Sequence, residues 1–268
     1  MRDRPAAVAG TWYPGNPDAL RQDVDEYLEQ AAVEPGTGVR AVIAPHAGLM
    51  FSGPVGAWAY KAAAAGSYDA AILVGPSHFV GFDGVAVWPS GRFESPLGPA
   101  RIDEALAATC LASPIAHDRE DAHRREHSLE MQLPFVARLL PGVPIVPLVM
   151  GHQTREAAES LGDALGRALA GRRVLLVASS DLSHYHDART AAALDAVVLR
   201  HVEAFDPGAL MTALEREPAH ACGGGPMVAV LRAARAGGAG AAAAVAGPRA
   251  RRRPRPADGR LRDDPRAG

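Results

Sequence analysis

Histidine occurs in three places where a short apolar run of the sequence gives way to glycine, proline or serine. His46 lies in VIAPHAGLMFSG and His78 lies in AILVGPSHFVGFDG. Asp181 and His184 lie in VLLVASSDLSHYHD, which also contains His186. Such apolar runs are typical of strands, and ligand sites in open α/β sheets gather at the carboxyl ends of the strands. We therefore expect these side chains to meet in one pocket, where neutral imidazoles can bind a metal ion.

Two imidazoles leave the coordination sphere of a metal ion incomplete, and Cys222 is the candidate for a third ligand. It lies in AHACGGGPM, where three glycines let the backbone approach a ligand closely and Pro226 can open a helix. A thiol near a helix N-terminus has a lowered pKa, which favours the thiolate that binds metals. The other cysteine, Cys110, lies in the helical pattern ALAATCLA and is interpreted as a small buried apolar residue.

A fourth segment, AHRREHSLEMQLPF, carries His123, Glu126 and His127 in the H-x-x-E-H order of inverted zinc peptidases. That pattern needs both histidines on one helix face, with Glu126 as the general base. The residues before it show little apolar periodicity, whereas an apolar helix face begins at Leu129. We therefore favour Glu126 and His127 as a group at a helix start that faces the pocket. A plain helix N-terminal cap that includes Ser128 is the alternative.

The elements that must position these residues follow from short apolar runs that alternate with longer helical patterns. The alternation predicts an α/β fold, a single-domain αβ sandwich with a mostly parallel central sheet. The expected strands are Val39–Ala44, Ala70–Gly75, Gly84–Trp88, Pro144–Met150 and Arg173–Ser179. The expected helices are Pro17–Gln30, Pro54–Ala65, Ile102–Ala112, Ser128–Leu140, Arg155–Ala170, Ala188–Phe205, Pro207–Arg216 and Pro226–Ala236.

Composition narrows the class of protein. The chain has 268 residues, of which 48% are hydrophobic and 22% charged, which suits a globular protein rather than a disordered one. It has no apolar run of about 18 residues and no evident secretory signal, so no membrane association is expected. The two cysteines fit a reducing cytosol, and we expect a cytoplasmic protein. The net charge of −2 gives no reason to expect nucleic acid as a partner.

The C-terminal segment differs from the rest of the chain. Residues 247–268 contain eight Arg and three Asp, and we expect an Arg/Pro-rich disordered tail after a folded domain of residues 1–246. The chain has a single lysine, Lys61, which indicates high-GC coding. The segment from 236 to 268 is therefore either genuine or the product of a frameshift in a GC-rich gene.

Six blocks in this order resemble the Memo family, whose prokaryotic members are called AmmeMemoRadiSam system protein B. The blocks are AGTWYP (9–14), APHAGLMFSG (44–53), GPSH (75–78), EHSLEMQLPF (126–135), SSDLSHY (179–185) and ACGGGPM (221–227). The resemblance implies the fold of class III extradiol dioxygenases, which bind non-haem Fe(II). It also implies closing strands after the helix that follows Cys222, where this chain instead becomes rich in Ala and Gly.

The resemblance also implies roles for single residues. His46, His78 and Cys222 match the family's metal ligands, and Asp181 and His184 match the acidic and histidine residues of the same pocket. In the related dioxygenases the histidine at the position of His184 acts as acid and base. We place Trp12, Ser77, Glu126 and His127 in the wall of that pocket.

The sequence is compatible with three functions. The first is a redox or oxygen-handling protein with one metal ion. Iron (Fe²⁺) is expected first, as in the related dioxygenases, and copper or zinc are the alternatives because the family has cysteine where the dioxygenases have a carboxylate. The second is a non-catalytic module that uses the pocket to bind a small molecule, a peptide or a radical-SAM partner of the same system. The third is a zinc peptidase that uses His123, Glu126 and His127.

Overall fold

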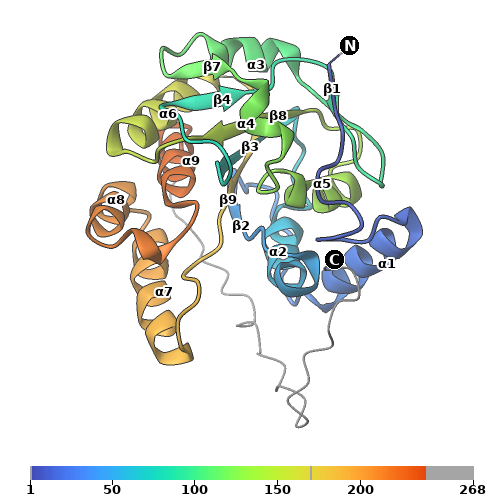
Figure 1. The fold of residues 1–268 in the computed structure, drawn as a ribbon, viewed down its shortest axis with the longest axis horizontal. Helices are drawn as coiled ribbons and strands as arrows, with labels where there is room; N and C mark the ends of the chain where they lie inside the picture. The colour runs from blue at the N-terminus through green and yellow to red at the C-terminus, as the bar shows by residue number, and fades with distance from the viewer. Residues whose placement is uncertain (1, 170, 240–268) are drawn as a thin grey trace, which may run out of the picture.

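The computed structural model describes residues 2–169 and 171–239, and a six-stranded sheet lies at its centre (Figure 1). The strand order is β2-β9-β3-β8-β4-β7, and neighbours run parallel except β4 and β8, which are antiparallel. The strands are Ala41–Ala44 (β2), Ala70–Pro76 (β3), Val85–Val87 (β4), Ala116–Asp118 (β7), Ile145–Met150 (β8) and Val174–Ser179 (β9). A mostly parallel α/β sheet is therefore confirmed.

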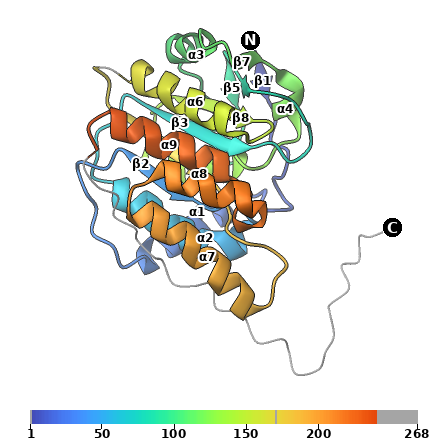
Figure 2. The same ribbon diagram turned by 90° about the vertical axis from the view of Figure 1, so that its left-hand side faces the viewer.

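Helices cover both faces of this sheet. On one face α1, α2 and α5 pack together, and on the other α6 and α9 pack side by side, with α8 and then α7 beyond them (Figure 2). The α-helices are Pro17–Gln30 (α1), Leu49–Ala63 (α2), Glu104–Leu111 (α3), Glu120–Arg124 (α4), Leu133–Leu139 (α5), Arg155–Ala168 (α6), Ala188–Glu203 (α7), Pro207–Arg216 (α8) and Gly224–Ala236 (α9). Two 3₁₀ turns, Glu130–Gln132 and Pro218–His220, and a small sheet of Asp3–Arg4 (β1), Arg92–Phe93 (β5) and Ala100–Arg101 (β6) complete the fold.

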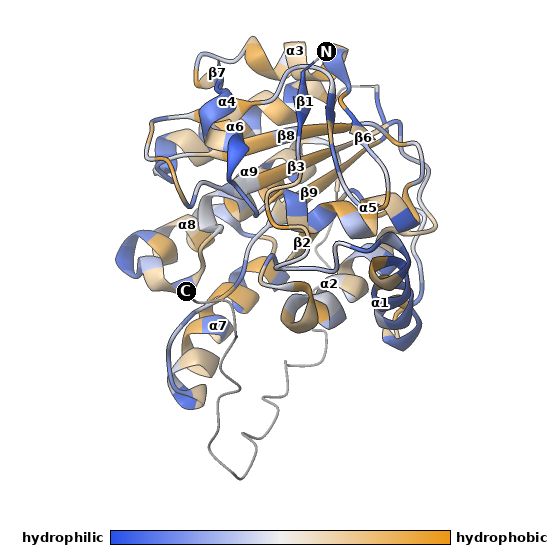
Figure 3. Cartoon of the chain, turned by 45° about the vertical axis from the view of Figure 1, so that its right-hand side comes forward, coloured by the Kyte–Doolittle hydropathy of each residue, from blue (hydrophilic) through white to orange (hydrophobic). Residues whose placement is uncertain are grey.

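The middle of the sheet is the core of the protein. Every residue of β3, β8 and β9 is buried, because helices cover these strands on both faces. This double burial explains why their sequences are continuous apolar runs rather than alternating ones (Figure 3). At the carboxyl ends the runs stop and polar residues follow, so the polar segments emerge at one edge of the core.

Several helix limits differ from the expected ones. α2 begins at Leu49 rather than at Pro54, because buried Leu49 donates its backbone N–H to the carbonyl of Trp12 (2.8 Å) and so starts the helix earlier. α9 begins at Gly224, which leaves Pro226 in its first turn, where an N–H needs no partner in the helix. The expected helix from Ser128 divides into a 3₁₀ turn followed by α5.

Buried Glu130 holds the N-terminal segment against the body of the protein. Its carboxylate accepts hydrogen bonds from the Arg4 guanidinium, from the backbone N–H groups of Ala7 and Val8, and from the Tyr13 hydroxyl. Four donors satisfy a carboxylate that is 0% exposed, so its charge is well compensated. The clamp fixes the segment that carries Trp12 next to the start of α2.

Two further expectations concern the ends of the chain and membranes. The expected domain limit at residue 246 and the tail at 247–268 lie outside the described residues. Within the described residues, no helix combines the length and the apolar character needed to cross a bilayer.

Candidate metal centre

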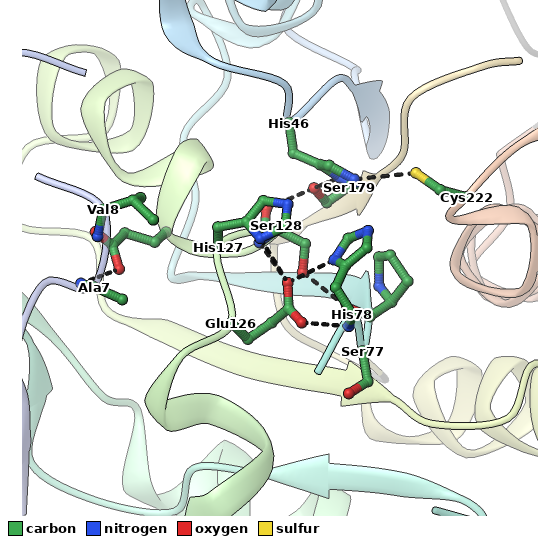
Figure 4. Close-up of polar contacts among 12 residues, drawn as sticks. Ala7, Val8, His46, Ser77, His78, Glu126, His127, Ser128, Ser179 and Cys222 are labelled. Atoms are coloured by element: carbon green, nitrogen blue, oxygen red, sulfur yellow. Dashed lines mark hydrogen bonds and ion pairs between the residues drawn. The ribbon is translucent and has the colours of Figure 1, made fainter. Parts of the chain in front are cut away.

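The three histidine segments meet because their strands are neighbours. β2, β9 and β3 lie side by side in the sheet, and the segments that follow them carry His46, then Asp181 and His184, then His78. Cys222 reaches the same place just before α9, where its backbone N–H donates to the carbonyl of Asp181 (3.3 Å). Residues far apart in the chain therefore share one edge of the sheet (Figure 4).

His46, His78 and Cys222 form a compact set of candidate ligands. Their ligand atoms all lie within 4.8 Å of one another, and His46 Nε2 is 3.1 Å from Cys222 Sγ. The two imidazole rings stand nearly perpendicular, with centroids 5.1 Å apart. Ligand atoms around one tetrahedral ion lie about 3.4–3.8 Å apart at ordinary metal–ligand bond lengths. Small side-chain shifts would therefore bring all three groups onto a single ion.

Ser179 fixes which nitrogen of His46 carries the proton. Its hydroxyl has one proton, and that proton must go to the Ser128 carbonyl (2.7 Å), because a carbonyl can only accept. Ser179 Oγ therefore accepts from Gln132 Nε2 (2.9 Å) and from His46 Nδ1 (2.8 Å). With the proton on Nδ1, the lone pair of neutral His46 is on Nε2, which faces Cys222. This is the arrangement that a metal-binding histidine needs.

Glu126 does the same for His78. Its buried carboxylate accepts from His78 Nδ1 (2.8 Å) and from the backbone N–H of His78 (2.6 Å), and Ser128 N–H donates to it as well (2.8 Å). Neutral His78 therefore also offers Nε2 as its ligand atom. Glu126 is therefore a pocket residue. The cap alternative does not form, because the 3₁₀ turn that follows has Leu129 at its N-cap and no side-chain capping hydrogen bond.

Asp181 connects His46, His184 and Cys222. Its Oδ1 accepts from the backbone N–H of His46 (2.7 Å), and its Oδ2 lies 3.7 Å from His184 Nε2. Its own backbone N–H donates to Cys222 Sγ (3.3 Å). Ligand atoms of Asp181, His184 and Cys222 also lie within 4.8 Å of one another. His184 is thus placed beside the sulfur, on the partly exposed side of the site.

Charge in the site is shared between thiolate, carboxylates and imidazoliums. Burial works to raise the pKa of Cys222, but hydrogen bonds with His184, His46 and His78 outweigh it and lower that pKa to about 5. The pKa of His184 rises to about 10, through its pairing with the Asp181 carboxylate first and its interaction with Cys222 second. Burial alone would lower the pKa of His78, yet Cys222 and Glu126 raise it to about 9. A metal ion would take the place of these protons between the imidazoles and the sulfur.

His127 and Trp12 form one wall of the site. The His127 ring is stacked on that of His78, with centroids 4.4 Å apart, and lies 4.2 Å from the ring of Trp12. Burial lowers the pKa of His127 to about 4, so its imidazole is neutral at pH 7. Its buried Nδ1 has no hydrogen-bond partner, although it lies 3.6 Å from Glu126 Oε1. Ser77, in contrast, donates its hydroxyl to the Val80 carbonyl and so holds the turn that presents His78.

The inverted zinc-peptidase pattern does not form. His123 ends up in α4, which stops at Arg124, so His123 and His127 do not share a helix. The His123 ring packs against Trp88 and Phe93, and its Nε2 lies 3.1 Å from the Ala86 carbonyl. In the described part of the chain, Glu126 and His127 group with His78 instead of His123. The peptidase expectation is therefore wrong, because the chain leaves the helix between the two histidines.

A substitution at His123 distinguishes experimentally between a metal site that excludes His123 and a zinc-peptidase site that needs it. The His123→Gln variant is expected to keep its bound metal, since His123 lies outside the ligand set, although the loss of a buried ring lowers its stability. Metal analysis per mole of folded protein, with circular dichroism as the folding control, checks this. A metal-free but folded His123→Gln protein would contradict the placement of the site.

Sequence reasoning missed Ser179 and Gln132. Ser179 is the last residue of β9 and 0% exposed, and Gln132 lies in the 3₁₀ turn before α5 and is also 0% exposed. A buried polar side chain needs a partner, and here Ser179 pairs with His46 while Gln132 pairs with Ser179. A serine directly after the run VLLVA was the available signal, but only the fold shows that it faces His46.

Removal of the Ser179 hydroxyl tests the tautomer argument. Ser179→Ala takes away the acceptor for His46 Nδ1–H, and loss of such outer partners lowers metal affinity roughly 10- to 100-fold. We expect a larger dissociation constant for the metal in a chelator competition assay. The thermal unfolding temperature is also expected to fall, because the buried Gln132 amide and Ser128 carbonyl each lose a hydrogen-bond partner. A Ser179→Thr variant, which keeps the hydroxyl, is the matched control. Equal affinities of Ser179→Ala and wild-type protein would contradict the role of Ser179.

Known proteins are similar to this chain in sequence over most of its length. A family model described as Memo-like protein matches residues 4–246. A MEMO1 family protein of Thermotoga maritima is 34% identical over 244 residues, which cover 86% of this chain and 88% of the relative. A MEMO1 family protein of Pyrobaculum aerophilum is 35% identical over 247 residues, which cover 88% of each chain. The crystal structure of an uncharacterized protein from Escherichia coli K12 matches with a TM-score of 0.41 and 20% identity, covering 62% of this chain and 75% of the other.

Proposed function

Since this chain belongs to the Memo family, we propose that it is a metal-dependent redox protein that handles oxygen at a mononuclear centre. One observation carries the proposal: two imidazoles and one thiol, brought from separate parts of the chain, present their ligand atoms to a common point. Ser179 and Glu126 bind Nδ1 of His46 and His78, which leaves Nε2 as the ligand atom of each ring. The low pKa of Cys222, about 5, supplies a thiolate at neutral pH.

The donor set fits a borderline transition metal. Imidazole suits iron, copper and zinc alike, and one thiolate makes the set softer than the two histidines and one carboxylate of non-haem iron oxygenases. We propose iron as the resident metal, with copper and zinc as the alternatives. Bound iron would supply one-electron exchange with a substrate and with oxygen. The thiolate also makes the site sensitive to oxidation at sulfur.

His184 is the proposed acid–base group. It is partly exposed, lies beside Cys222 and is paired with Asp181, and its pKa of about 10 keeps it protonated at pH 7. It can therefore donate a proton to a substrate at the centre and recover it from water. Asp181 orients His184 and stabilises its charged form. Neutral His127 can accept a hydrogen bond from a substrate at the opposite wall.

The experiment combines metal analysis with oxygen uptake. Protein purified without oxygen is analysed for iron, copper and zinc, and oxygen consumption is then followed after addition of 4-methylcatechol. We expect about one equivalent of iron and measurable uptake in the wild type. The His184→Gln variant is expected to keep the metal and lose the uptake. Absence of iron and copper, or equal uptake by both proteins, would refute the redox proposal.

A complex of this protein with a radical-SAM protein stays a prediction.

A further inference from the structure

Large apolar side chains that are exposed to solvent gather around the site. Across residues 2–169 and 171–239 they are Trp12, Met50, Phe51, Phe79 and Tyr185. Phe79 directly follows His78, and Tyr185 directly follows His184. Soluble proteins usually bury such residues, and a group of them beside a polar pocket marks a binding site. We call these five residues the apolar rim.

Ring contacts join the apolar rim to the imidazoles of the site. The ring of Trp12 lies 4.2 Å from that of His127, and the ring of Phe79 lies 5.9 Å from it. The ring of Tyr185 lies 5.9 Å from that of His184. Three of the five rim residues are therefore in ring contact with imidazoles of the site.

Phe51 and Met50 are the two remaining residues of the rim. Both lie in the first turn of α2, which begins three residues after His46. Their exposed fractions, 66% and 70%, leave most of each side chain without a protein neighbour. A hypothetical Cβ on Gly48 would lie 3.7 Å both from the Phe51 ring and from the Trp12 backbone carbonyl, so the Phe51 ring lies close to the backbone of the Trp12 segment.

Tyr185 is held in an unfavourable backbone conformation. Its φ of 61° lies in the left-handed region, which is rare for a bulky residue, and its side chain is fully exposed. The fold gains no packing from this aromatic ring, yet the ring is kept beside His184. Backbone strain of this kind concentrates at ligand-binding positions.

We infer that the ligand of this centre is an amphiphilic small molecule, in which a metal-binding polar headgroup is attached to an extended apolar body that the rim covers. The inference rests on the proposed metal centre and names the class of its substrate. The polar centre selects the headgroup. Rim residues from four separate segments surround the path outward and remove the apolar body from water.

A pair of hydroxamates that differ only in the apolar body tests the inference. Acetohydroxamate and octanohydroxamate are titrated into the metal-loaded protein by isothermal calorimetry without oxygen. Each buried methylene strengthens binding about fourfold, so burial of half of the added chain predicts an affinity ratio on the order of 50-fold. The double variant Phe51→Ser, Phe79→Ser is expected to lose most of this ratio. Its matched control, Phe51→Leu, Phe79→Leu, is expected to keep it.

The outcomes separate the inference from the proposed function. If acetohydroxamate fails to bind the loaded protein, the metal centre is wrong and the inference falls with it. If both hydroxamates bind equally, the proposed metal centre is supported but the inference is overturned. The apolar rim would then be a binding surface for a macromolecular partner. If the longer tail helps binding equally in wild-type protein and in the serine variant, the apolar body lies elsewhere, which also overturns the inference.

Discussion

In the Cys222→Ala variant, the metal bound per protein is expected to fall from about one equivalent to less than about a tenth of an equivalent. Loss of an outer partner alone costs roughly 10- to 100-fold in affinity, and loss of a direct ligand costs more. His46→Ala is expected to have the same result, because His46 Nε2 faces the sulfur at 3.1 Å. Metal analysis after desalting, on protein shown to be folded by circular dichroism, measures both.

The chain provides its own control for this result. Cys110 is buried in α3, where it belongs to the apolar core. Cys110→Ala is therefore expected to keep the metal and to lose only some stability. Metal contents close to the wild-type value in both Cys222→Ala and His46→Ala would mean that the ion, if present, is bound elsewhere.

Alkylation of Cys222 in the metal-free protein is expected to be nearly independent of pH between pH 8 and pH 6. Its pKa of about 5 means that the thiol is almost fully ionised across this range and becomes protonated only as the pH falls through about 5. The thiolate fraction of an ordinary thiol with a pKa of 9.0 falls about 100-fold over the same two pH units. Reaction with iodoacetamide, followed by mass spectrometry of the peptides, gives the rate for each cysteine.

Two comparisons test the cause of this flat profile. Removal of His184 in a His184→Ala variant takes away the first of the three imidazole partners that lower the pKa of Cys222, so the profile should shift to higher pH. Cys110, whose pKa burial raises to about 12, is expected to stay unmodified until the protein is unfolded. A Cys222 rate that rises tenfold per pH unit from pH 6 to pH 8 would contradict the shared-charge description of the site.

The segments that carry the site could be identified from the chain alone. Apolar runs such as VLLVA predict strands that are buried on both faces, and His46, His78 and His184 follow such runs. Parallel strands bring their carboxyl ends to the same edge, so the meeting of these histidines followed from the fold class. The short strands β1, β5, β6 and β7 were not predicted, because two or three residues carry no periodic signal.

The local sequence was misleading where the course of the backbone decided the outcome. H-x-x-E-H at 123–127 matched a peptidase pattern, but α4 ends at Arg124 and turns His123 toward Trp88. Ser77 stands beside His78 in the chain, yet its hydroxyl bonds to Val80 rather than to a site residue. The spacing of two residues along the chain predicts the relative direction of their side chains only when both lie in one continuous helix or strand.

The amino-acid sequence by itself determined the α/β class, the order along the chain of β2, β3, β4, β8 and β9, and the residue types that supply nitrogen and sulfur ligands. Only the tertiary structure decided that β2, β9 and β3 are neighbours, that Cys222 Sγ lies 3.1 Å from His46 Nε2, and that Ser179 and Glu126 set the two histidine tautomers. The physical reason is that hydrogen bonds and metal ligation act over about 3 Å in space. The residues involved here are separated by up to 176 positions along the chain, and no local pattern records such a distance.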